Sequence, residues 1–178
     1  GFTPAAAAPA RARPLASERV TARAPEKVVA DIANPGIEHV DYAAAIRRSL
    51  PPILSTAAHM RERAIDAVLA LLVASEADPQ PALAVVEAHL GAVRAKGCAE
   101  LLEAARQLHP AQRLPLAHLA LPALKRRPTG EIEQLLAGVD GLIHRDGHIE
   151  VFEYVLARLL RQQLGEAMEP GRAQPGHT

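Results

Sequence analysis

The stretch Ile132–Leu164, IEQLLAGVDGLIHRDGHIEVFEYVLARLLRQQL, contains the clearest structural signal in this 178-residue chain. On both sides of Asp146-Gly147, apolar residues recur every three or four positions, which is the spacing of one face of an α-helix. Glycine readily adopts the left-handed conformation that ends a helix, so Gly147 marks a turn. Two long apolar faces joined by so short a loop are expected to pack antiparallel. The stretch therefore predicts a helical hairpin.

The composition extends this prediction to the rest of the folded region. Hydrophobic residues make up 49% of the chain and are mostly Ala, Leu and Val, with only two Tyr and two Phe. Ala and Leu favour helices, whereas strands favour β-branched and aromatic residues. No segment of strand length alternates with period two, so we predict an all-α bundle of about seven or eight helices. Further helical stripes occur at Met60–Leu72, Leu83–Leu90, Cys98–Leu108 and Leu114–Leu124.

The stripe Leu114–Leu124 differs from the others because it is apolar nearly all round, apart from His118. A helix that is apolar on every side is expected to be enclosed by its neighbours, so this pattern predicts the central helix of the bundle. His118 is then expected to be a hydrogen-bonded core or edge residue. Pro122 lacks an N–H group and should kink or end the helix.

Proline and glycine mark the predicted domain boundaries. Residues 1–35 are rich in Ala, Pro and Arg, and repeated prolines block a continuous helix, which predicts a flexible linker. The helical domain is expected to cover 36–166, and residues 167–178, with two prolines and two glycines, to form a disordered tail. A chain that begins at Gly1 is expected to be part of a longer protein.

Charge and cysteine content narrow the function classes. Lys and Arg total 20, and Asp and Glu total 20, so the chain has no excess positive charge with which to bind a nucleic-acid backbone. No apolar run approaches the roughly 18 residues that span a bilayer, so no membrane span is expected. The single cysteine, Cys98, is interpreted as a small buried residue of a helix.

The sequence contains no complete catalytic motif, so we predict neither catalytic residues nor a cofactor for this chain. It has no HExxH zinc-protease helix, no glycine-rich phosphate loop and no nucleophile elbow. His144 and His148 have the separation of zinc ligands on a helix. However, Gly147 between them breaks the helix that would align both rings, and no Glu occupies the base position.

Two interpretations of the loop His144–Glu153 remain open. The carboxylates of Asp146, Glu150 and Glu153 could converge around a cation, since hard ions favour several carboxylate oxygens. Alternatively, the loop is purely structural. Asp146 and Gly147 then form the turn, Ile149 plugs the core, and the glutamates stabilise the positive N-terminus of the next helix.

The same loop carries a family resemblance. The pattern Asp146-Gly147-x-Ile149-x-x-x-Glu153, between two amphipathic helices, resembles the helical hairpin of TerB-like domains. These all-helical modules are named for tellurite-resistance proteins and also occur in DjlA-type co-chaperones. The acidic positions of that family map onto Asp146 and Glu153. The resemblance implies a cation-sensing module as an alternative function, which calorimetry with calcium, magnesium and zinc would test.

A longer resemblance covers about 36–166. The segments Arg113–Leu124, Gly141–Leu156 and Ser49–Pro52 are similar to the C-terminal region of bacterial membrane zinc metallopeptidases related to HtpX and the CAAX prenyl endoproteases. This likeness implies a zinc-dependent HExxH unit upstream in the membrane, with the present chain as its soluble, non-catalytic domain. It would lie at the cytoplasmic face of the inner membrane and contact the peptidase domain, protein substrates or adaptors. A free-standing helical adaptor is a further alternative.

Overall fold

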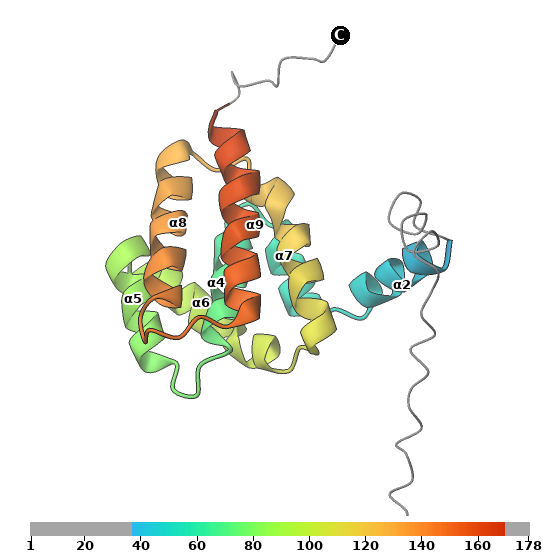
Figure 1. The fold of residues 1–178 in the computed structure, drawn as a ribbon, viewed down its shortest axis with the longest axis horizontal. Helices are drawn as coiled ribbons and strands as arrows, with labels where there is room; N and C mark the ends of the chain where they lie inside the picture. The colour runs from blue at the N-terminus through green and yellow to red at the C-terminus, as the bar shows by residue number, and fades with distance from the viewer. Residues whose placement is uncertain (1–36, 170–178) are drawn as a thin grey trace, which may run out of the picture. The chain divides into compact units, whose positions relative to one another are not determined.

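The computed structural model describes residues 37–169, which form eight helices and no strand (Figure 1). This confirms the predicted all-α bundle. The predicted linker over 1–35 and residues 170–178 of the predicted tail lie outside the described residues. The helices are α2 (Ile37–Arg48), α3 (Pro52–His59), α4 (Ala64–Val73), α5 (Gln80–Leu90), α6 (Ala92–Arg106), α7 (Pro110–Leu124), α8 (Thr129–Ile143) and α9 (Val151–Met168).

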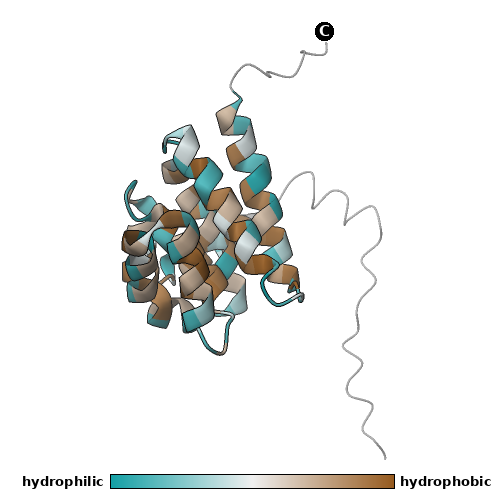
Figure 2. Ribbon diagram, turned by 90° about the vertical axis from the view of Figure 1, so that its left-hand side faces the viewer, coloured by the Kyte–Doolittle hydropathy of each residue, from teal (hydrophilic) through white to brown (hydrophobic). Residues whose placement is uncertain are grey.

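The chain divides into two compact units, and the second begins at Ala43. The described part of the first unit is the beginning of α2, over residues 37–42. The second unit contains α3–α9, the hydrophobic core and every feature discussed below. Within this unit the connecting loops are largely hydrophilic, while hydrophobic residues lie along the helices (Figure 2). None of the described helices is long and apolar enough to cross a bilayer.

Helix α4 is the centre of the bundle. All ten of its residues are buried, because the run Ala64–Val73 is apolar on every side except at Asp66. It contacts α3, α5, α6, α7 and α8. The expected helix over Met60–Leu72 therefore begins later, at Ala64, and Met60 lies in the preceding connection with 44% of its surface exposed.

The prediction that Leu114–Leu124 is the enclosed helix is wrong. In α7 the residues Leu116, Ala117, Ala120, Leu121, Ala123 and Leu124 are buried. His118 and Pro122 are exposed, because among the described residues no helix covers the face on which they lie. An apolar circumference shows that a helix is able to be enclosed, but the partners available in space decide whether it is.

The ends of α7 also differ from the expectation. The helix begins at Pro110, where His109 acts as the N-cap: its Nδ1 accepts a hydrogen bond from the Ala111 N–H at 3.1 Å. Gln112 completes the cap by accepting from the His109 N–H at 2.8 Å. Pro122 does not stop the helix at once, since α7 continues to Leu124.

The C-terminal hairpin is confirmed. Helices α8 and α9 lie side by side and run antiparallel (Figure 1). Gly147 has a φ of +75° in the loop between them, as a glycine turn requires. Ile149 does not plug the core, because 45% of its surface is exposed. The buried residues of the two helices are Ile132, Leu135, Gly138, Val139, Leu142 and Ile143 in α8, and Glu153, Leu156, Ala157, Leu160 and Leu164 in α9.

Candidate functional site

The three carboxylates predicted as ion ligands lie in the loop before α9 and in its first turn. Asp146 Oδ1 accepts a hydrogen bond from the His148 N–H at 2.9 Å, which forms the turn. Glu150 is the N-cap of α9, and the Glu153 side chain accepts from the Glu150 N–H at 3.1 Å in a reciprocal capping box. Asp146 and Glu150 are exposed, whereas only 7% of the Glu153 surface is. Each of the three therefore has a structural task in the loop or the cap.

Burial raises the pKa of Glu153 above its ordinary value, and the Glu150 N–H opposes the rise. The negative charges of Glu150, Glu76 and Asp146 add to it. A carboxyl group with a raised pKa binds its proton more tightly in the folded than in the unfolded chain. Its contribution to stability is therefore greatest below the unfolded value, near 4.5, and declines as pH rises through the folded-state pKa.

Replacing this carboxyl by an amide tests the effect. Glu153→Gln keeps an oxygen that accepts from the Glu150 N–H and removes the charge. We expect the melting temperature at pH 7 to rise by about 2 °C, and the difference from the native chain to vanish below pH 4.5. The control is Glu133→Gln, at an exposed position on α8. Thermal melts over a pH series measure the melting temperatures of both variants. A rise for Glu153→Gln that is equal at every pH contradicts the raised pKa of Glu153.

No group of three or more His, Cys, Asp and Glu side chains in residues 37–169 is arranged to hold a metal ion. His144 follows the last residue of α8, and its Nδ1 lies 2.9 Å from the Asp140 carbonyl oxygen. His148 lies beyond Gly147 in the loop, so the two rings are not aligned on one helix. Arg145, which is ion-paired with Glu76 at 2.7 Å, places a positive charge within the loop. Ion binding by this loop stays a prediction.

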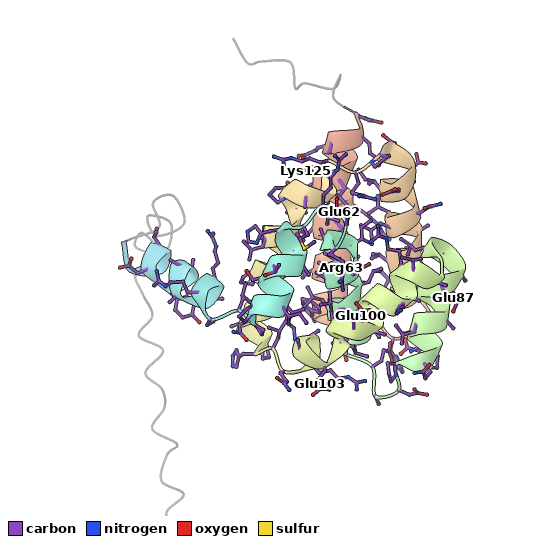
Figure 3. The ribbon with its side chains drawn as sticks, turned by 180° about the vertical axis from the view of Figure 1, so that it is seen from behind. Glu62, Arg63, Glu87, Glu100, Glu103 and Lys125 are labelled. Atoms are coloured by element: carbon purple, nitrogen blue, oxygen red, sulfur yellow. The ribbon has the colours of Figure 1, made fainter. Side chains whose placement is uncertain are left out.

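An ionic cluster around the buried Asp66 joins α4 to α6, and the sequence analysis did not find it. Asp66 is only 3% exposed; its Oδ2 accepts from Arg63 Nε at 2.9 Å and its Oδ1 from Arg94 Nη1 at 3.1 Å. Arg63 also donates to Glu100 of α6 at 3.1 Å, and Figure 3 shows these two residues next to one another. Arg94 also donates to the Glu62 carbonyl. The only local signal was a single charged residue within an apolar helix.

Gly97 of α6 makes this cluster possible. A Cβ atom at this position would lie 2.3 Å from Asp66 Oδ2, so only a glycine lets the carboxylate approach α6. Burial raises the pKa of Asp66, and Arg94 and Arg63 oppose the rise. The neighbouring Cys98 is fully buried, as expected, and burial together with the charge of Asp66 raises its pKa to about 12. The cluster is a structural joint between two helices.

The uncovered face of α7 forms the floor of a hollow, which we call the α7 groove. Pro115, His118, Leu119 and Pro122 lie three and four positions apart and so share one face of the helix. The hollow has a volume of about 380 Å³. Its other lining residues are Arg47, His59, Arg61, Ala123 and Arg126.

The α7 groove is basic. Its lining contains three arginines and two histidines but no carboxylate. Arg61 Nη2 donates to the Arg126 carbonyl at 2.7 Å, which joins the chain before α4 to the end of α7. Among residues 37–169, no Asp or Glu is ion-paired with Arg47, Arg61 or Arg126. The groove therefore offers positive charge that the described part of the chain does not neutralise.

A second hollow, of about 620 Å³, lies beside the loop before α9, and one of its two arginines is ion-paired. Its apolar lining includes Ile149 and Tyr154, both exposed. Arg161 is ion-paired with Asp140, and Arg158 Nη1 donates to the Tyr154 hydroxyl at 3.3 Å. The α7 groove is therefore the stronger candidate for binding a charged partner.

Comparisons with models of protein families, with curated proteins and with solved structures found no significant match to this chain.

Proposed function

We propose that this chain is a non-catalytic protein-interaction domain that binds its partner in the α7 groove. In the longer protein that the sequence resemblance implies, it would be the cytoplasmic domain of a membrane-bound zinc metallopeptidase. There it would bind substrates or adaptors and so recruit them to the peptidase or regulate it.

The observation that carries the proposal is an apolar face of α7 that no helix within residues 37–169 covers, bordered by arginines with which no carboxylate of those residues is ion-paired. Covering the apolar surface of Pro115, Leu119 and Pro122 would gain about 25 cal/mol for each Å² removed from water. Apolar grooves with a few polar groups at their edges are typical recognition sites for short protein segments. The charged border then supplies specificity and rapid association more than it supplies affinity.

Selection from a random peptide display library tests the proposal. The full chain is immobilised, and the affinity of the enriched peptides is then measured for two variants. In each variant one aliphatic residue is replaced by glutamine. Leu119→Gln makes the groove floor polar, whereas Val93→Gln changes an 82% exposed residue of α6. We expect enriched peptides that lose most of their affinity for Leu119→Gln and keep it for Val93→Gln. Circular dichroism melts confirm that both variants are folded.

Two results would reject the interaction function. One is a library that yields no enriched peptide, and the other is a set of peptides that bind both variants alike. The location within a membrane peptidase is tested separately by the coding sequence upstream of Gly1. Absence of membrane spans and of an HExxH motif there would remove that part of the proposal.

A further inference from the structure

We infer that the α7 groove recognises an extended, acidic peptide segment of about five residues. The inference rests on the proposed interaction function and adds the chemical class of the partner. It is carried by the length of the groove, by its volume and by the charges around its floor.

The dimensions of the groove favour an extended peptide. Its lining runs from Pro115 of α7 to Arg126 in the turn that follows the helix, which at the rise of an α-helix is about 16 Å. A volume of about 380 Å³ spread over this length is too narrow for a second helix, whose diameter with side chains is about 10–12 Å. An extended chain advances about 3.3 Å per residue, so about five residues fill the groove.

The charges favour carboxylates. Arg47, Arg61 and Arg126 come from α2, from the connection before α4 and from the connection after α7, and they surround one apolar floor. A guanidinium group binds a carboxylate through two parallel hydrogen bonds, which is stronger than a contact between neutral groups. In an extended peptide, alternate side chains face opposite sides. A segment that alternates apolar and acidic residues therefore complements the floor and the rim together.

By composition, neither terminal segment, 1–36 or 170–178, matches such a ligand. Residues 170–178 contain one charged side chain, that of Arg172. Residues 1–36 carry more basic than acidic side chains, namely Arg11, Arg13, Arg19, Arg23 and Lys27 against Glu18, Glu26 and Asp31. Charge complementarity therefore favours an acidic segment from outside residues 1–178, which we assign to a partner protein.

Fluorescence polarisation with two labelled pentapeptides tests the inference on the full chain. The acidic probe is Glu-Leu-Glu-Leu-Glu, and the basic probe of equal length is Lys-Leu-Lys-Leu-Lys. We expect the acidic probe to bind at least about tenfold more tightly, and its affinity to fall as salt screens the charges.

Charge reversal provides the matched control. Arg47→Glu with Arg126→Glu should weaken the acidic probe about tenfold and strengthen the basic one, since attraction becomes repulsion. Arg48→Glu with Lys96→Glu changes the net charge equally, at exposed positions outside the groove, and should change neither affinity by more than about twofold.

Several outcomes would overturn the inference. The first is that the two probes bind with equal affinity, and the second is that the acidic probe does not bind. The third is that both double variants lose the same affinity for the acidic probe. If a second copy of the chain fills the groove, light scattering would show a dimer that the reversal at Arg47 and Arg126 dissociates, and the acidic probe would not bind. If the display library instead yields groove-dependent peptides that are not acidic, the interaction function stands and the acidic ligand is wrong.

Discussion

Gly97→Ala is expected to destabilise the folded chain by about 3 kcal/mol, although alanine is normally the better residue inside a helix. The added Cβ would lie 2.3 Å from Asp66 Oδ2 and 2.7 Å from Asp66 Cγ. Asp66 has little freedom to withdraw, because it is buried in α4 and bonded to Arg63 and Arg94. Either the helices separate or the ion pairs break, and breaking a buried pair leaves a poorly solvated charge.

Urea denaturation measures this effect, with Gly165→Ala as the matched control. Gly165 also lies within a helix, but a Cβ there meets nothing within 4 Å, so this variant should be stabilised by about 0.5–1 kcal/mol. Adding Asp66→Ala should remove most of the cost of Gly97→Ala, because the clashing carboxylate is then gone. If Gly97→Ala lowers the unfolding free energy no more than Gly165→Ala does, the close approach of Asp66 to Gly97 is wrong. If the two substitutions at 66 and 97 are simply additive, the clash is not the cause.

Leu69→Ala is expected to cost about 3 kcal/mol, because it leaves a cavity in the middle of the enclosed helix α4. Leu69 has no exposed surface. The same substitution at Leu119 should cost less than about 1.5 kcal/mol, since that side chain lies partly exposed on the floor of the α7 groove.

Equilibrium unfolding of the two leucine variants shows whether α4 or α7 is the central helix. A larger loss of unfolding free energy for Leu69→Ala than for Leu119→Ala supports α4 as the central helix. The dependence of the unfolding free energy on urea concentration should be unchanged in both variants. A loss at Leu119 equal to that at Leu69 would mean that α7 is enclosed in solution. The α7 groove would then be covered, and the interaction proposal would lose its surface.

The elements that the sequence predicts well are those specified by neighbouring residues. The hairpin of α8 and α9 follows from two apolar stripes and one glycine turn, all within Ile132–Leu164. The identity of the central helix was not predictable in this way. Ala64–Val73 and Leu114–Leu124 are both apolar nearly all round, and only the packing of distant helices decides that the first is enclosed.

The candidate sites show the same division. The positions of Asp146, Glu150 and Glu153 in one loop and its following turn were predicted, because residues so close in sequence are also close in space. The joint between Asp66 and Gly97 was missed, since its partners lie on two helices whose contact leaves no local pattern. The α7 groove was missed for a related reason: its arginines come from separate connections and helices, and each looks like an ordinary surface residue in the sequence.

The fully buried thiol of Cys98 gives the protein a built-in reporter. It is the only cysteine in the chain, and with a pKa of about 12 almost none of it is thiolate at neutral pH. An alkylating reagent can therefore modify the thiol only when an opening of the folded chain exposes it. The rate of labelling, measured by mass spectrometry, then reports how often the core around α6 opens, without any substitution in the chain.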